Sequence, residues 1–276
     1  MLKQRLITAA ILIPLAVWAV FASSLTTFTT LIVAVALLAA WEWHQMIGIQ
    51  SPGMRVMLAV DLIIVLYLAI TQLNPYFIIS IGILIWLIAL VVILGFSNKS
   101  LAERLSHVFK NKVFGAISSI LILTVFVVSS ITLKAFSEIG AFLFFFVMVT
   151  VWLADTGGYF AGKRFGKHAL APAVSPNKTW EGVAGGVLFA SIWAIGFYWV
   201  KTPTTITLFE WLLLAVVTVT VSIVGDLFES LYKRAFSVKD SGNLLPGHGG
   251  ILDRIDSLIA AVPVFTFLML IMGGYK

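Results

Sequence analysis

Residues 230–256 read SLYKRAFSVKDSGNLLPGHGGILDRID, the most polar stretch of a very apolar chain. The stretch contains four basic residues, three acids, one histidine and four glycines, and hydrophobic segments lie directly before and after it. Charged side chains at the edge of an apolar membrane layer cost free energy, so they usually mark a functional site. We therefore expect the chemistry of this protein to take place here.

The rest of the chain predicts an all-α, polytopic integral membrane protein. Of its 276 residues, 61% are hydrophobic and 11% charged, and the mean hydropathy is +1.07. Soluble domains are roughly half apolar and a quarter charged. A helix needs about 20 apolar residues to cross a bilayer, and the chain offers about nine such runs. They are residues 6–21, 25–43, 54–71, 76–95, 113–133, 141–161, 180–200, 206–231 and 251–272.

The length predicts one membrane domain, residues 1–276, in which N-terminal helices (1–133) precede the helices that carry the polar motifs (138–276). The chain has no cysteine, which excludes disulfides, thiolate catalysis and cysteine-based zinc sites. Walker, dinucleotide-binding, nucleophile-elbow and H-E-x-x-H motifs are also missing, so the chemistry that those motifs support is not expected.

The basic residues predict the orientation of the spans. With the amino terminus in the cytoplasm and the carboxyl terminus outside, all but Lys134, Lys201 and Lys276 of the 18 Lys and Arg residues lie inside. This agrees with the positive-inside rule, so topology explains the net charge of +6 and we expect no nucleic-acid partner. A cleaved signal peptide would also begin with a short basic segment and an apolar run. A second apolar run follows at once, which favours an uncleaved first span.

Acidic residues lie at two helix ends on the expected cytoplasmic side. Asp226, Glu229 and Lys233 share one face of the eighth span, and Asp253 and Asp256 share one face of the last. The connecting loop can bring the two faces together, and clustered carboxylates need a cation. Oxygen ligands of this kind suit Mg²⁺. The alternative is ordinary helix-end charge, with Glu229 paired to Lys233 and acids favouring the helix dipole.

A glycine-rich turn leads into the last helix. Gly247, Gly249 and Gly250 surround His248, and backbone N–H groups in such a turn can approach phosphate oxygens closely. Alone, the turn could be only a hinge. Beside the basic residues of the same stretch, it predicts a phosphate-binding cradle, in which His248 contacts phosphate or orders the turn.

A second polar region follows the sixth apolar run. Residues 152–167 read WLADTGGYFAGKRFGK, and Asp155 is an intramembrane carboxylate that needs a partner. Ser175 is expected to cap the next helix, with Pro176 at its first position. Lys163, Arg164 and Lys178 are candidates to bind an anionic headgroup, or to act as simple interfacial contacts. The spacing of Gly182 and Gly186 fits either close packing within the chain or a homodimer.

The polar stretch resembles the signature of phosphatidate cytidylyltransferases (CDP-diacylglycerol synthases). The resemblance spans 27 residues: Ser230-x-Tyr232-Lys233-Arg234, Lys239-Asp240, then Pro246-x-His248-Gly249-Gly250-x-x-Asp253-Arg254-x-Asp256. Residues 155–160 and 175–182 are similar to a second block of that family. The resemblance implies a multi-pass enzyme of the bacterial inner membrane with a cytoplasmic active site. Its substrates would be CTP and phosphatidic acid, and its cofactor Mg²⁺, with a second cation left open.

The resemblance also implies roles for individual residues. The implied metal ligands are Asp226, Asp253, Asp256 and Asp155, and the implied catalytic residues are Asp226, Lys233, Asp253 and Asp256. The implied substrate-binding residues are Lys163, Arg164, Ser175, Lys178, Arg234, Lys239, Asp240, Gly247, His248, Gly249, Gly250 and Arg254. A lipid phosphate is already a charged nucleophile, so the site must neutralise charge and align the reactants rather than supply a base.

Two other functions remain open from the sequence. A CTP-dependent lipid kinase would pass the γ-phosphate to a lipid alcohol and would need a base. A secondary transporter could use Asp61, Asp155 and Asp226 as an ion path. Transporters often contain internal inverted repeats, and the first half of the chain has no acidic turn motif like that of the second, which disfavours this reading.

Overall fold

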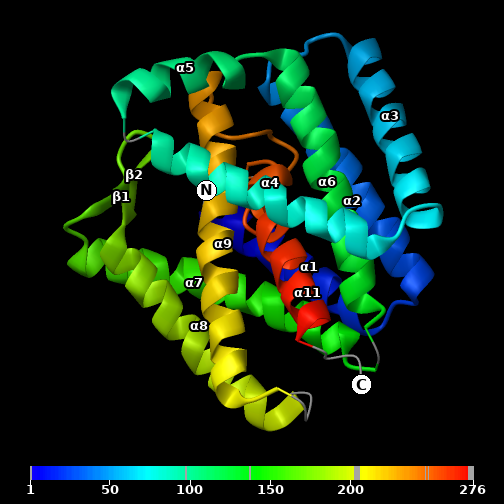
Figure 1. Ribbon diagram of the computed structural model, residues 1–276, viewed down its shortest axis with the longest axis vertical. Helices are drawn as coiled ribbons and strands as arrows, with labels where there is room; N and C mark the ends of the chain where they lie inside the picture. Colours follow the sequence, from blue (N-terminus) through cyan, green and yellow to red (C-terminus); the bar gives the residue numbers. More distant parts are fainter. Residues whose placement is uncertain are drawn as a thin grey trace.

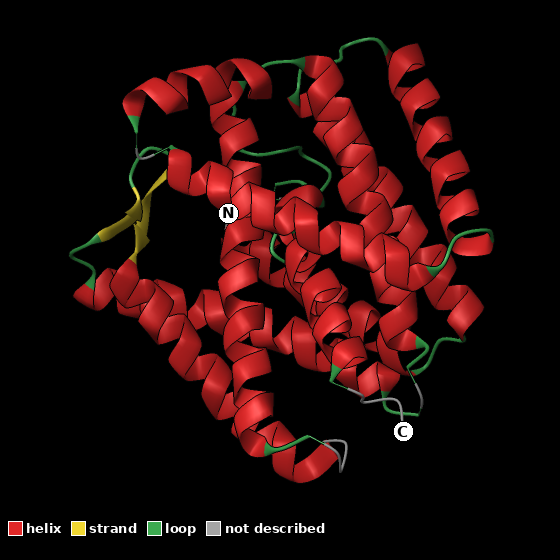
Figure 2. Cartoon of the chain, viewed as in Figure 1, coloured by secondary structure: helices red, strands yellow, loops and turns green. Residues whose placement is uncertain are grey.

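The computed structural model describes residues 2–96, 98–136, 138–201, 206–245, 247 and 249–272. Most of these residues are helical (Figures 1 and 2). The elements are α1 (Leu2–Phe21), α2 (Leu25–Met46), α3 (Pro52–Thr71), α4 (Pro75–Gly95), α5 (Lys99–Phe109), α6 (Lys112–Lys134), α7 (Gly140–Phe165), β1 (Ala169–Ala171), β2 (Ser175–Thr179), α8 (Trp180–Lys201), α9 (Leu208–Ala235), α10 (Leu252–Ile255) and α11 (Leu258–Ile271).

The predicted membrane fold is confirmed. Within the described residues, 8 helical segments are long and apolar enough to cross a membrane, and α1 adds a shorter apolar segment, Ala10–Phe21. α3 and α4 turn rows of large apolar side chains outward, among them Ile64, Leu84 and Val91. Apolar surfaces of this kind are stable in contact with the hydrocarbon core of a lipid bilayer. The sides of the membrane on which the two termini lie remain a prediction.

Short polar residues decide where most helices begin. Each of these residues accepts a backbone N–H of the first helical turn through its side-chain oxygen. At the start of α9, Glu210 also reaches back to Thr207, which completes a capping box. The capping residues are Ser24, Ser51, Asn74, Asn98, Asn111 and Thr207.

The predicted cap at Ser175 and helix start at Pro176 are wrong. Residues 175–179 form β2, which pairs with β1 in an antiparallel hairpin, with Ala171 opposite Ser175 and Ala169 opposite Thr179. Trp180 N–H continues the pairing by donating to His168 O at 2.9 Å. Thr179 is the residue that caps α8, because its Oγ1 accepts the N–H of Gly182 at 3.1 Å.

The last apolar run, predicted as one helix, is interrupted. α10 ends at Ile255 and α11 begins at Leu258. At the break, the Asp256 side chain accepts the N–H of Ser257 at 2.8 Å. On α9, Gly225 packs so closely against the Asp256 carbonyl that an added Cβ would overlap with it. The break therefore lies where the last segment crosses α9.

Glycines also set the closest helix contact, between α7 and α8. A Cβ at Gly157 would overlap with the Gly185 carbonyl, and one at Gly186 would overlap with Ala154. Gly182 faces the Gly158 carbonyl. Small residues allow this close approach of two backbones in a membrane. Of the two predictions for Gly182 and Gly186, close packing within the chain is the one that the structure bears out.

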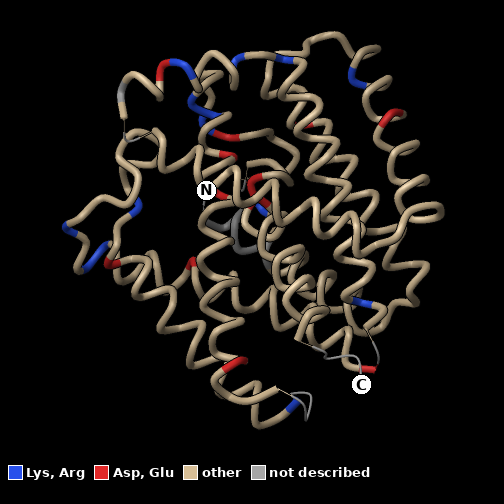
Figure 3. The backbone as a smooth tube through the Cα atoms, in the orientation of Figure 1, with Lys and Arg blue, Asp and Glu red and all other residues tan. Residues whose placement is uncertain are grey.

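The polar connector after α4 forms the amphipathic helix α5. Its last residue, Phe109, is buried and packs edge-on against Phe228 and Tyr232 of α9. Figure 3 shows charged positions gathered at the end of the bundle that carries α5, near its centre and around the β1–β2 hairpin. The polar end of α9 is therefore enclosed by the N-terminal half of the chain.

Candidate active site

The end of α9 and the segment that follows it form the centre of the site. We call residues 236–251, between α9 and α10, the signature loop. Gly247 and Gly249 both have a positive φ, a backbone conformation that favours glycine. Leu245 N–H donates to Gly249 O at 3.0 Å, which closes a tight turn. Two of the three glycines that suggested a phosphate cradle, Gly247 and Gly249, are therefore favoured by the turn itself. His248 lies outside the described residues.

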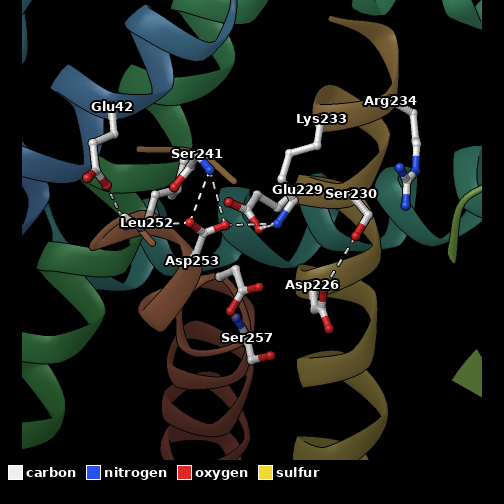
Figure 4. A network of polar contacts seen from close by, with 12 residues as sticks. Glu42, Asp226, Glu229, Ser230, Lys233, Arg234, Ser241, Leu252, Asp253 and Ser257 are labelled. Atoms are coloured by element: carbon white, nitrogen blue, oxygen red, sulfur yellow. Dashed lines mark hydrogen bonds and ion pairs between the residues drawn. The ribbon is translucent and has the colours of Figure 1, made fainter. Parts of the chain in front are cut away.

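Asp253 joins the signature loop to α9 (Figure 4). Its carboxylate accepts the N–H of Gly250 at 2.8 Å and that of Ser241 at 3.0 Å. Lys233 Nζ donates to its other oxygen at 3.0 Å. Three donors around one buried carboxylate stabilise its charged form. They also fix the path of the loop around it.

Lys233 lies between two carboxylates. Besides Asp253, its Nζ donates to Glu229 Oε2 at 2.5 Å. The side chain of Glu229 is only 1% exposed, and its Oε1 has no hydrogen-bond partner. The pairing expected from the i, i+4 spacing is therefore present, and Glu229 keeps one oxygen that is not used by Lys233.

Three carboxylates form what we call the acidic group: Asp226, Glu229 and Asp256. Each offers one oxygen, and these oxygens lie within 4.8 Å of one another. Negative charges this close repel unless a cation compensates them. An oxygen-only set of carboxylates fits Mg²⁺, which binds through one or two carboxylates together with phosphates and water.

The acidic group contains two of the four predicted metal ligands, and Glu229 in place of the other two. Asp226 and Asp256 lie together as expected, but among the described residues the third carboxylate is Glu229. Asp253 lies beside the group, with its oxygens bonded to Lys233 and to the loop backbone. Metal binding by Asp253 and by Asp155 stays a prediction.

The second polar region meets the first at α9. Lys178, from β2, forms an ion pair with Asp226, and Asp155, from α7, interacts electrostatically with Asp226, Lys178 and Arg254. A pocket of about 250 Å³ opens between these elements. Its polar lining consists of Asp155, Tyr159, Asn177, Lys178 and Thr179.

The other predicted substrate-binding residues surround this centre at varying distances. Arg234 Nε donates to the carbonyl of Val174 in the hairpin turn at 3.3 Å, which ties α9 to the hairpin. Lys163 lies over the ring of Tyr159 at the exposed end of α7. Arg164, Lys239, Asp240, Gly247 and Arg254 are exposed, Ser175 and Gly249 are partly buried, and Gly250 is buried.

One buried acid was missed entirely. Glu42, on α2, is 1% exposed and accepts the N–H of Leu252 at 2.9 Å. The signal was present in the sequence, because a carboxylate inside an apolar run needs a partner. Its partner lies more than two hundred residues further along the chain, which no local pattern reveals.

Comparison with known proteins identifies the family. A family model described as "Cytidylyltransferase family" matches residues 3–272. The chain belongs to the cytidylyltransferase family. Two of its relatives are similar over nearly their whole length, and both are named phosphatidate cytidylyltransferase. The protein from Pseudomonas aeruginosa is 40% identical over 275 residues, covering 99% of this chain and 98% of the relative.

The second relative, from Haemophilus influenzae, is 34% identical over 97% of this chain and 98% of its own length. A third, from Bacillus subtilis, carries the same name and is 42% identical over 142 residues, about half of each chain. The cytidylyltransferase fold therefore extends over both halves of this chain, including the N-terminal helices that sequence patterns describe only as apolar.

Proposed function

We propose that this protein transfers the cytidylyl group of CTP to phosphatidic acid, giving CDP-diacylglycerol and pyrophosphate. The observation that carries the proposal is the meeting of the acidic group with Lys178 and Lys233, which come from different elements. Such a site offers carboxylates that can bind a metal cation and lysine side chains that can bind phosphate. The names of the full-length relatives support the same reaction.

The reaction joins two anions. An oxygen of the lipid phosphate attacks the α-phosphorus of CTP, and the bond from that phosphorus to the β-phosphate oxygen breaks. Its electron pair leaves with pyrophosphate. The lipid phosphate already carries about −1.5 to −2 charge at neutral pH, so this step needs no general base. The protein must neutralise charge and place the two groups in line.

The chain's own residues divide this work between the two polar regions. Lys178, at the mouth of the pocket, is placed to receive the lipid phosphate. Lys233, Arg234, Lys239 and the glycine turn of the signature loop are proposed to hold the departing pyrophosphate. Each is a charge-assisted donor, which binds phosphate oxygens strongly.

The acidic group would hold the cation. Mg²⁺ bound by Asp226, Glu229 and Asp256 would neutralise and orient the nucleotide phosphate oxygens. Asp253 and Asp155 are proposed as further ligands at the two sides of the group. Lys178 and Lys233 form ion pairs with two of these carboxylates, Asp226 and Glu229, and so partly compensate the negative charge of the group.

An apolar groove offers a place for a lipid chain. The groove, of about 220 Å³, lies between α4, the hairpin, α8 and α9. It shares Leu170, Val183 and Ile223 with the pocket of Lys178. A phospholipid whose phosphate sits at Lys178 would therefore find an apolar surface next to its headgroup. We propose that one acyl chain of phosphatidic acid occupies this groove.

The active site is proposed to face the cytoplasm, in a bacterial-type inner membrane. The positive-inside distribution of Lys and Arg supports this orientation. CTP would then arrive from water, and the lipid from the adjacent leaflet.

The products of the reaction test the proposal. Purified protein in detergent, with Mg²⁺ and a mixture of phosphatidic acid and diacylglycerol, is given CTP labelled at either its α- or its γ-phosphorus. We expect the α-label in the lipid and the γ-label in pyrophosphate. Transfer of the γ-label to lipid would instead establish a kinase, and no lipid label combined with ion movement in liposomes would establish a transporter.

A further inference from the structure

Glu42 connects the N-terminal half of the chain to the signature loop. It lies on α2, and its Oε2 accepts the N–H of Leu252, the first residue of α10, at 2.9 Å (Figure 4). The residue before α10, Ile251, makes no side-chain cap of its own. A carboxylate from a distant helix therefore supplies the acceptor that the local sequence lacks.

The signature loop is packed around this carboxylate. A Cβ added at Gly242 would overlap with Glu42 Oε1, and one added at Gly250 would overlap with Glu42 Oε2. At Gly242, the three nearest atoms to such a Cβ all belong to Glu42. Glycine is required at these two positions because the backbone passes directly over the carboxylate.

The same short segment of backbone serves two carboxylates. Gly250 N–H donates to Asp253, and Leu252 N–H donates to Glu42. Asp253 in turn accepts from Lys233. The chain of contacts therefore runs from Glu42 through the loop backbone to the Asp253–Lys233 pair.

Stability alone gives a poor reason for a carboxylate at this position. Glu42 is buried and takes part in none of the ion pairs found among the described residues, and its Oε1 has no hydrogen-bond partner. Burying a carboxyl group that has one oxygen without a hydrogen-bond partner is unfavourable. An intramembrane acid of this kind usually has a functional role.

We propose that Glu42 is a positioning residue for the reaction. It holds the start of α10 and the end of the signature loop so that Asp253 and Lys233 keep their places. Glu42 acts through the loop and does not touch substrate. The inference rests on the proposed cytidylyl transfer only because one of its tests measures the turnover of that reaction.

The first test compares three substitutions. Glu42→Ala removes the acceptor and should lower kcat by on the order of 10- to 100-fold, as loss of a supporting contact does. The KM for CTP should change by less than about threefold, since Glu42 makes no contact with substrate. Glu42→Gln keeps an acceptor oxygen at the same place and should restore most of the activity. Glu103→Gln, on the exposed side of α5, is the control and should behave as wild type.

The second test uses Gly242, which has no assigned part in catalysis. Gly242→Ala should lower kcat because its Cβ displaces the carboxylate. In the Glu42→Ala background, the same substitution should have little further effect, because the atoms that it meets are gone. A double-mutant cycle measures this coupling. It can be repeated with the thermal unfolding midpoint in detergent, which needs no activity.

Several results would overturn the inference. They are wild-type kcat in Glu42→Ala, equal losses in the Gln and Ala variants, or additive effects in the Gly242 cycle. If Glu42→Ala does not fold, the Glu42→Gln and Gly242→Ala variants still test the inference. Wild-type kcat in Gly242→Ala would show that the contact between Gly242 and Glu42 does not affect the reaction. An inactive wild-type protein would instead count against the proposed function.

Discussion

The two polar regions of this cytidylyltransferase are built in different ways. The hairpin of β1 and β2 is shaped by pairing of its own backbone, and its Lys178 side chain forms an ion pair with Asp226 rather than supporting the hairpin. The described part of the signature loop has one bridge between Leu245 and Gly249, and its shape depends on carboxylates that accept its N–H groups. Changes in the hairpin should therefore affect one substrate, whereas changes around the loop should affect turnover itself.

The largest effect is expected at Asp253. Asp253→Asn removes the charge that pairs with Lys233 and replaces one acceptor oxygen with a donor, so the loop loses part of its support. If Asp253 also binds the cation, the loss amounts to several kcal/mol, or about 10³-fold in kcat. Turnover at saturating Mg²⁺, CTP and lipid measures it. Near-normal kcat in a folded variant would remove Asp253 from the reaction.

Lys178 should show the opposite kinetic pattern. Lys178→Met removes the positively charged side chain that lines the pocket and leaves Asp226 without its ion-pair partner. We expect kcat/KM for phosphatidic acid to fall on the order of 10²-fold, with a smaller change in the KM for CTP. Lys178→Arg is the matched control and should keep much of the activity. A loss confined to the KM for CTP would place Lys178 on the nucleotide instead.

Gly249 tests the glycine turn of the signature loop. Gly249→Ala forces a side chain onto a backbone with a φ of +81° and brings a Cβ within 2.8 Å of Asp253 Oδ2. A strain of 1–2 kcal/mol predicts about a 10-fold loss of kcat. Gly196→Ala, where an added Cβ meets no atom within 4 Å, is the control. Equal behaviour of the two variants would mean that the turn does not constrain the site.

The smallest effect is expected in the apolar groove. Thr220 lines it on α9, and Thr220→Trp should obstruct an acyl chain there. The ratio of kcat/KM for long-chain over short-chain phosphatidic acid should fall at least about fivefold, as pocket-filling substitutions do. Leu213→Trp, on the same helix but away from the groove, is the control. An unchanged ratio would place the chain elsewhere.

Local patterns in the sequence were enough for much of this structure. In a run of about 20 apolar residues that crosses a bilayer, the backbone N–H and C=O groups find hydrogen-bond partners by forming a helix. The helical fold therefore follows from these runs. The i, i+4 spacing of Glu229 and Lys233 predicted their pairing. Gly247 and Gly249 were predicted to bind phosphate, which stays a prediction, and their positive φ shows that the turn itself favours glycine at both positions.

Contacts between different elements account for what was missed. The hairpin replaced the predicted cap at Ser175 because residues 169–171 supply backbone partners that propensity does not register. Glu229 was placed on the acidic face of α9 but not among the named metal ligands, since its nearness to Asp256 depends on how α9 crosses the last segment. Glu42 meets Leu252 only once the two halves of the chain have packed.

The location of the divalent cation tests the central claim most directly. Crystals of the protein grown with CTP and Mn²⁺, a substitute for Mg²⁺, would reveal the metal by its anomalous scattering. The account predicts a peak within coordination distance of carboxylate oxygens from both α9 and the α10–α11 break, Asp226 and Glu229 on one side and Asp256 on the other. Metal bound to CTP alone, or at any position away from these three residues, would contradict it.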